Sequence, residues 1–174
     1  PLPVREREIN WGIRASGGVM PNGHGVEILL IEDNPNDVEM TLRALKKHHL
    51  ANHVLVLEDG AKALEYLFGE GEYLGRAVDD RPKVILLDIK LPKVNGIEVL
   101  RRLKGDARTR TTPVVMLTSS REEKDLTESY HLGVNSYIVK PVDFQKFTEA
   151  VAELGLYWML LNEPPPSASS GKAG

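Results

Sequence analysis

The sequence predicts an α/β fold in which five short parallel strands form one sheet with helices on both of its faces. Short, nearly unbroken apolar runs alternate along the chain with segments of helical periodicity. Unbroken runs of this kind are typical of strands that are buried on both faces of a parallel sheet. An order of five strands, each followed by a helix, favours right-handed crossovers. Such folds place their functional sites at the carboxyl ends of the strands.

The expected elements follow from these patterns in order. The five strands are residues 28–31, 54–57, 84–87, 114–117 and 137–139. Helical spacing of apolar residues is found in three segments: Val38, Leu42 and Leu45; Ile97, Leu100 and Leu103; and Phe144, Phe147, Val151, Leu154 and Trp158. Asn34 before Pro35 marks the start of the first of five helices, and Gly133 marks the end of the fourth.

The chain has the size of one ordinary domain. Its 174 residues, 41% of them hydrophobic and 27% charged, are close to the average for globular chains. We expect residues 26–162 to form the folded domain. Residues 1–25 show neither helical nor strand periodicity and are interpreted as a leader or arm. Residues 163–174 are interpreted as a flexible tail, because consecutive prolines end any helix there and small residues follow.

Charge and composition exclude several classes of function. The chain carries 22 basic and 25 acidic residues, a net charge of −3, which disfavours indiscriminate binding to nucleic acid or to anionic membranes. It has no cysteine, so disulfide frameworks, thiolate metal sites and cysteine nucleophiles are excluded, and a reducing, cytoplasmic location is expected. No apolar run approaches the roughly 20 residues of a membrane-spanning helix, and the N-terminal residues lack the apolar stretch of a signal peptide.

Charged and polar residues stand at the ends of four of the five expected strands. The first strand ends at Glu32 and Asp33, the third at Asp88, the fourth at Thr118 and the fifth at Lys140. Each alone is as well explained by a turn or a helix cap. Together they place three carboxylates, one hydroxyl and one ammonium at one crevice, where the carboxylates need a compensating cation. Mg²⁺ takes one or two carboxylates, waters and a phosphate oxygen, so this set predicts phosphoryl chemistry at a Mg²⁺ site.

Two other sites with the same strand–helix order fit the residues less well. A mononucleotide-binding fold of the flavodoxin type cradles phosphate in its first loop, whereas the acidic loop at residues 32–37 would repel phosphate without a metal. A metal-dependent hydrolase of the aspartyl-phosphate type requires a general acid two residues after its nucleophile. The residue two positions after Asp88 is Lys90.

Four motifs resemble the receiver domain of two-component response regulators. They are Ile-Leu-Leu-Ile-Glu-Asp-Asn at 28–34, Leu-Leu-Asp-Ile-Lys-Leu-Pro at 86–92 with Gly96, Leu-Thr-Ser at 117–119 and Tyr-Ile-Val-Lys-Pro at 137–141. The spacings between Asp88, Thr118 and Lys140 also match the family. The resemblance covers residues 26–158 and implies the five-stranded, flavodoxin-like sheet in the order 2-1-3-4-5.

The resemblance also implies a role for each site residue. Asp88 would accept the phosphoryl group from a phosphohistidine of a sensor histidine kinase. Mg²⁺ would be bound by Asp33 and Asp88, by Glu32 directly or through water, and by the backbone carbonyl of Lys90. Lys140 would pair with the phosphoryl group, and its bond to Pro141 would be cis. Thr118 would hydrogen-bond to the phosphoryl group, Tyr137 would turn inward behind it, and the face built from the fourth helix, the fifth strand and the fifth helix would change.

Three further features resemble a subgroup, the single-domain regulators paired with bacterial and cyanobacterial phytochrome kinases. They are the loop at residues 34–37, an additional segment at 69–82 and the ending at 156–164. The additional segment is interpreted as a surface insertion, with a partner contact as the alternative. The apolar residues 157–161 exceed one helical stripe. They predict either a homodimer through the fifth helix and this terminus or a long fifth helix packed on its own domain.

The sequence therefore predicts a stand-alone phosphoaccepting receiver that acts through a changed protein surface and is not an enzyme on other substrates. The residues after Pro164 are too few for a DNA-binding module, so direct nucleic-acid binding is not expected. Two alternatives remain open: an adaptor that keeps the fold without phosphorylation, and a metal-dependent phosphatase. The complete set of charged strand-end residues argues against a pure adaptor, which has no need to bury this charge.

Overall fold

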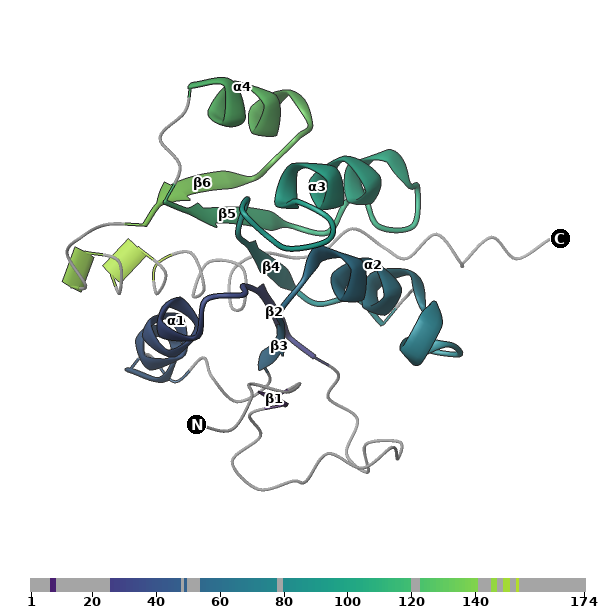
Figure 1. Cartoon of the computed structure of the whole chain (residues 1–174), viewed down its shortest axis with the longest axis horizontal. Helices are drawn as coiled ribbons and strands as arrows, with labels where there is room; N and C mark the ends of the chain where they lie inside the picture. The colour runs from purple at the N-terminus through teal and green to yellow at the C-terminus, as the bar shows by residue number, and fades with distance from the viewer. Residues whose placement is uncertain are drawn as a thin grey trace, which may run out of the picture.

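The computed structural model describes residues 7–8, 26–47, 49, 54–77, 80–119, 123–140, 145–146, 149–150 and 153. Its centre is a sheet with five parallel strands (Figure 1). The parallel strands are β2 (Ile28–Ile31), β3 (Val54–Leu57), β4 (Val84–Leu87), β5 (Val114–Thr118) and β6 (Ser136–Val139). They lie in the order β3-β2-β4-β5-β6, so the predicted order 2-1-3-4-5 is confirmed.

A sixth, very short strand adds to the edge of this sheet. β1 (Arg7–Glu8) pairs antiparallel with β3, with Arg7 opposite Val56 and Glu8 opposite Leu55. The sequence did not predict a strand within residues 1–25. Two residues cannot display a period of two, and the pairing rests on backbone groups that are independent of side-chain pattern.

Four α-helices and one 3₁₀-helix are present in the described part of the chain. They are α1 (Pro35–Lys47), α2 (Gly60–Phe68), η1 (Gly71–Tyr73), α3 (Gly96–Gly105) and α4 (Glu123–His131). Within the predicted fifth helix, the described residues 145–146, 149–150 and 153 are helical. The rest of that segment lies outside the described residues, as does the predicted cis bond before Pro141. No helix in the described part is long and apolar enough to cross a membrane.

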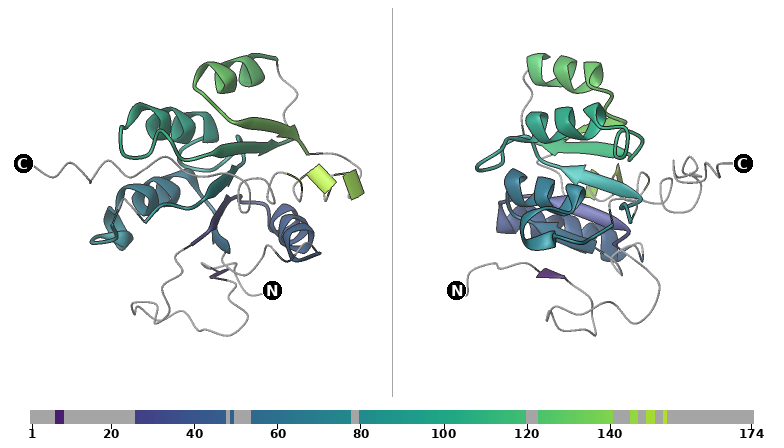
Figure 2. Two further views of the ribbon diagram at one scale, coloured as in Figure 1. Left: turned by 180° about the vertical axis from the view of Figure 1, so that it is seen from behind. Right: turned by 90° about the vertical axis from the view of Figure 1, so that its right-hand side faces the viewer.

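Successive residues of the parallel strands lie alternately in two separate apolar layers, one on each face of the sheet. Leu29 and Ile31 of β2 belong to the layer that contains the apolar faces of α2 and α3, whereas Ile28 and Leu30 belong to the layer that contains α1. The helices accordingly lie on opposite sides of the sheet (Figure 2). Because all four side chains of β2 are buried, its sequence shows an apolar run without alternation.

Local signals fix the ends of several helices. Pro35 is the first residue of α1, and Asn34 Oδ1 accepts a hydrogen bond of 2.9 Å from the amide of Asn36. Gly133 follows α4 with a φ of 89°, a left-handed conformation that glycine adopts without steric cost. Both predicted boundaries are confirmed.

The additional segment at residues 69–82 packs against α2. The Arg76 guanidinium lies 4.0 Å from the ring centroid of Tyr66, and its Nη1 donates a hydrogen bond of 3.1 Å to the Tyr66 carbonyl. The ring of Tyr73 meets that of Tyr66 edge to face, with centroids 5.1 Å apart. Leu74 is 84% exposed. The segment precedes β4 and therefore lies at the amino ends of the strands, away from the carboxyl ends, as expected for a surface insertion.

Candidate functional site

The charged residues predicted at the strand ends converge at one edge of the sheet. Glu32 follows β2 and Asp88 follows β4, and these neighbouring parallel strands are in register, with Ile31 opposite Leu87. The Glu32 amide donates to the carbonyl of Leu57, and the Asp88 amide donates to that of Ile31, so backbone pairing continues into the site. The two carboxylates are thus positioned by the sheet itself.

Three carboxylates form a cluster that can hold a metal ion. One oxygen each from Glu32, Asp33 and Asp88 lies within 4.8 Å of the other two. Glu32 is 2% exposed and Asp88 6%, whereas Asp33 faces solvent. Three hard oxygen donors with one open side fit a divalent cation that keeps several waters, as Mg²⁺ and Mn²⁺ do. The predicted metal residues Glu32, Asp33 and Asp88 are therefore brought together.

Lys140 directs its ammonium into the same cluster from the end of β6. Its side chain is 8% exposed and contacts the Glu32 carboxylate. Its Nζ lies 2.8 Å from Asp37 Oδ2 and 3.5 Å from Asp88 Oδ2. A buried ammonium among several carboxylates offsets part of their mutual repulsion.

Burial and charge shift the titration of this cluster. Burial raises the pKa of Glu32 to about 7, against the opposite effect of its contact with Lys140. Burial alone would lower the pKa of Lys140, but hydrogen bonds to Asp37 and Glu32 and the charge of Asp88 hold it above its usual value. One ammonium shared among several carboxylates does not fully compensate them. The cluster therefore retains a deficit of positive charge that a divalent cation would supply.

The loop after β4 fixes the position of Asp88 through backbone hydrogen bonds. The Asp88 Oδ1 accepts a hydrogen bond of 2.8 Å from the amide of Ile89, and the Ile89 carbonyl accepts one of 2.8 Å from Gly96. A Cβ atom on Gly96 would overlap the carbonyl oxygen of Asp88, which explains the glycine in the motif. Lys90 lies in this loop with an exposed side chain, and the resemblance assigns only its backbone carbonyl to the site.

Thr118 and Tyr137 are placed by β5 and β6. Thr118 is the last residue of β5 and pairs with Val139, but its side chain is outside the part that the structure describes. Tyr137 pairs with Met116, is partly buried, and packs against the apolar layer of α2 and α3. Both residues lie on the two strands that follow β4 in the order of the sheet.

Asp37 is a further residue of the site that was not predicted from the sequence. It stands in the first turn of α1, four positions after Asp33, and contacts Lys140 across 103 residues of sequence. The available signal was its place in the first turn of the helix that follows the acidic residues Glu32 and Asp33. It was not decisive, since an acidic residue in a first helical turn is common for its effect on the helix dipole alone.

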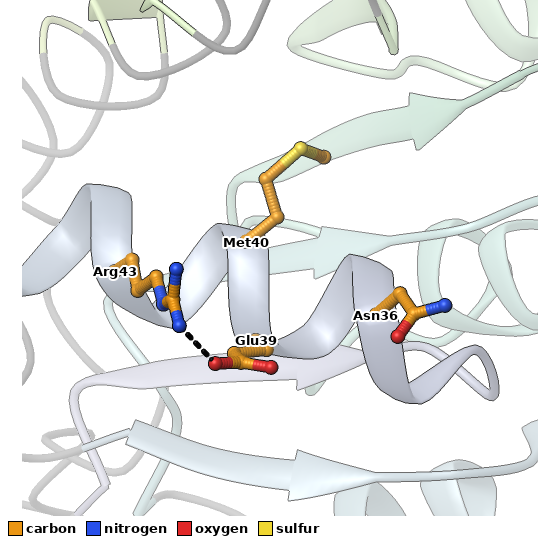
Figure 3. A pocket seen from close by; sticks show the side chains of 4 residues that line it. All are labelled: Asn36, Glu39, Met40 and Arg43. Carbon is orange, nitrogen blue, oxygen red and sulfur yellow. Dashed lines mark hydrogen bonds and ion pairs between the residues drawn. The ribbon is translucent and has the colours of Figure 1, made fainter.

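A shallow hollow on α1 lies outside this cluster. Asn36, Glu39, Met40 and Arg43 line it (Figure 3), and Met40 also packs against the apolar layer that contains α1. Glu39 and Arg43 form an ion pair at 2.5 Å, with both side chains more than half exposed. The hollow shares no residue with the carboxylate cluster.

Comparison with protein families gives one family for most of the chain. The family described as "Response regulator receiver domain" matches residues 28–152. The match includes every residue of the carboxylate cluster and Lys140.

Two relatives are similar over most of their own lengths. A probable methanogenesis regulatory protein, FilR2, from Methanothrix harundinacea is 39% identical over 88% of this chain and 96% of its own. The response regulator Rcp1 from Synechocystis is 36% identical over 76% of this chain and 88% of its own.

Solved structures with the same fold include regulators named for phytochromes. The phosphorylated cyanobacterial phytochrome response regulator RcpA has a TM-score of 0.74 and 36% identity, over 82% of this chain and 100% of that one. The Mn²⁺-bound form of Rcp1 has a TM-score of 0.72 and 34% identity, over 80% and 98%. The bacteriophytochrome response regulator RtBRR has a TM-score of 0.66 and 54% identity, over 82% and 86%.

Proposed function

Because the chain belongs to the family of response regulator receiver domains, we propose that Asp88 is its phosphoacceptor and that a sensor histidine kinase is the donor. The chain is a two-component response regulator, and its relatives include single-domain regulators of phytochrome signalling. The observation that carries the proposal is the cluster itself. A buried Asp88 carboxylate lies beside two further carboxylates and a buried ammonium at the carboxyl ends of the strands.

The chemistry at Asp88 is a direct phosphoryl transfer. One carboxylate oxygen of Asp88 forms a bond to phosphorus while the bond from phosphorus to the kinase imidazole breaks. The bonding electron pair stays on the imidazole nitrogen, which takes up a proton. Ile89 donates its amide to Asp88 Oδ1, and the other oxygen, Oδ2, is the one that faces Lys140.

We assign Mg²⁺ to the carboxylates of Glu32, Asp33 and Asp88, with the backbone carbonyl of Lys90 as a further ligand. When bound, the ion would neutralise charge on the transferring phosphoryl group. A Mn²⁺-bound form of the relative Rcp1 supports a divalent metal for this family.

Lys140, Thr118 and Tyr137 respond to the negative charge of the phosphoryl group on Asp88. The Lys140 ammonium would pair with a phosphoryl oxygen, and the Thr118 hydroxyl would hydrogen-bond to another. Movement of Thr118 toward the phosphoryl group would draw the start of α4 inward and let Tyr137 turn behind it. The output is then a changed protein surface that includes α4 and β6.

The partner of the reaction is a histidine kinase, and the relatives named as phytochrome response regulators favour one that carries a phytochrome. We include a cytoplasmic location in the proposal, because a kinase that uses ATP would work there. We retain the homodimer through the fifth helix and residues 157–161 as part of the proposal. Hydrolysis of the phosphorylated Asp88 would return the protein to its first state, without turnover of other substrates.

The test is phosphorylation of the purified protein by phosphoramidate or acetyl phosphate in the presence of Mg²⁺, followed by intact mass. We expect a gain of one phosphoryl group for the wild type and for Asp80→Asn, whose exposed carboxylate lies before β4 at the other end of the sheet. We expect no gain for Asp88→Asn. If Mg²⁺ binds but the wild-type mass does not change, the unphosphorylated adaptor becomes the better account. Release of phosphate from small phosphate esters would instead favour the phosphatase.

A further inference from the structure

Lys140 lies closer to Asp37 than to the proposed phosphoacceptor. Its Nζ is 2.8 Å from Asp37 Oδ2, a hydrogen-bond distance, and 3.5 Å from Asp88 Oδ2. The second distance permits an ion pair but exceeds that of a normal charge-assisted hydrogen bond. The ammonium is therefore held in part by Asp37, which is neither a proposed metal ligand nor the proposed phosphoacceptor.

Asp37 is distinct from the carboxylates of the metal cluster. The group of oxygens that can hold a metal comprises Glu32, Asp33 and Asp88, and it does not include Asp37. The Asp37 side chain is 30% exposed, whereas that of Lys140 is 8% exposed. Its contact within the site is with the ammonium.

The position of Asp37 is rigid because α1 holds it. It is the third residue of that helix, and its carbonyl accepts a hydrogen bond of 2.8 Å from the Thr41 hydroxyl. A carboxylate in a first helical turn is also favoured by the helix dipole. Asp37 therefore provides a fixed anchor, while the long side chain of Lys140 is the part that can move.

We propose that Asp37 is a positioning residue that holds the Lys140 ammonium back from Asp88 until a phosphoryl group competes for it. This inference rests on the proposed phosphorylation of Asp88. Transfer replaces the single negative charge of the Asp88 carboxylate with the two charges of a phosphoryl group, and the ammonium then moves toward it. We expect this movement to lengthen the 2.8 Å contact with Asp37, and Asp37 then opposes the phosphorylated state.

Removing the charge of Asp37 should therefore favour a phosphoryl group on Asp88. Asp37→Asn keeps the size of the side chain and weakens its hold on the ammonium. We expect beryllofluoride, which mimics a phosphoryl group on a carboxylate, to half-saturate this variant at about one fifth of the wild-type concentration in excess Mg²⁺. A fivefold change corresponds to about 1 kcal/mol, the usual upper value for a partly exposed ion pair.

The matched control lies on the same helix. Glu39→Gln removes the same charge two residues later, from a side chain that pairs with Arg43 and not with Lys140. It should leave the half-saturating concentration of beryllofluoride unchanged, because Glu39 pairs with Arg43. A general effect of net charge would instead act equally on both variants. A second control is Lys140→Met, alone and combined with Asp37→Asn. In the absence of the ammonium, the substitution at Asp37 should no longer tighten binding.

The outcomes separate this inference from the proposed function. Tighter beryllofluoride binding by Asp37→Asn, lost in the Lys140→Met background, supports it. Unchanged or weaker binding by Asp37→Asn overturns it, as does an equal effect of Glu39→Gln or a persistent effect without Lys140. If the wild type binds Mg²⁺ but takes up neither beryllofluoride nor a phosphoryl group, the proposed function itself fails. Thermal unfolding of each variant without ligand identifies any change caused by loss of fold.

Discussion

The Lys93 ammonium lies 2.6 Å from Asp59 Oδ2, and this contact joins the loop after β4 to the start of α2. Asp59 uses its other oxygen, Oδ1, to accept a hydrogen bond of 2.8 Å from the Lys62 amide, which caps α2. A Cβ atom on Gly60 would overlap the carbonyl of Val94, so backbone and side chains approach closely here. The loop that carries Lys90 is thus attached at both ends, to α2 and to the start of α3.

Asp59→Ala should destabilise the protein by about 1–2 kcal/mol, because it removes a helix cap together with an ion pair of a buried carboxylate. Asp59→Asn should cost less, since its amide oxygen can still accept from Lys62. Urea unfolding of both variants measures the difference. Lys83→Met, which breaks a pair whose carboxylate, Glu27, is more exposed than Asp59, is the control and should change stability little. Equal losses for the Ala and Asn variants would contradict the capping role.

Lys93→Gly should leave the free energy of unfolding nearly unchanged. Lys93 has a φ of 64°, and a left-handed conformation costs a residue with a side chain about 1–2 kcal/mol. Glycine relieves that cost, while the ion pair it removes contributes at most about 1 kcal/mol because Lys93 is mostly exposed. Lys93→Met loses the pair and keeps the strain, so it should be the less stable of the two in urea unfolding. The reverse order would show that the strain is not relieved.

Gly96→Ala should disrupt the site, because its Cβ would overlap the carbonyl oxygen of Asp88, which is backbone and cannot turn away. We expect a loss of a few kcal/mol of stability, comparable to other overpacking changes, and much weaker Mg²⁺ binding by calorimetry. Gly105→Ala, at the other end of α3 with open space around the new Cβ, should keep wild-type Mg²⁺ affinity. Normal affinity in Gly96→Ala would show that the loop can shift without effect on the site.

Mg²⁺ affinity should increase as the pH rises through about 7. The pKa of Glu32 is raised to about 7 by burial, so below that pH a proton must leave before the carboxylate can act as a ligand. Between its ordinary value of 4.5 and 7, the folded state binds this proton more tightly than the unfolded state. The metal-free protein should therefore lose stability as the pH rises over that interval.

Calorimetric titration with Mg²⁺ from pH 5.5 to 8.5 tests this dependence. In Glu32→Gln the increase near pH 7 should be absent, although overall affinity is lower. A wild-type affinity that stays constant over this range would contradict the role of Glu32 as a protonated group.

Much of the fold and most of the site were predictable from local patterns. Buried parallel strands such as β2 and β4 show as apolar runs, and the residues that follow them must meet at one edge of the sheet. Glu32, Asp33, Asp88 and Lys140 were identified for that reason, and the structure brings them together. The strand order came from the family resemblance, because apolar runs alone do not say which strands are neighbours.

Contacts between side chains that are distant in sequence were decided by the tertiary structure. Asp37 looks like an ordinary residue of a first helical turn until the end of β6 places Lys140 2.8 Å from it. The pairing of β1 with β3 and the contact of Asp59 with Lys93 are of the same kind. The sequence by itself determined which residues form strands and which charges stand at their ends, because periodicity is a local property. Which carboxylate holds the ammonium depends on a few ångströms between elements, and only the packing of α1 against the sheet sets that distance.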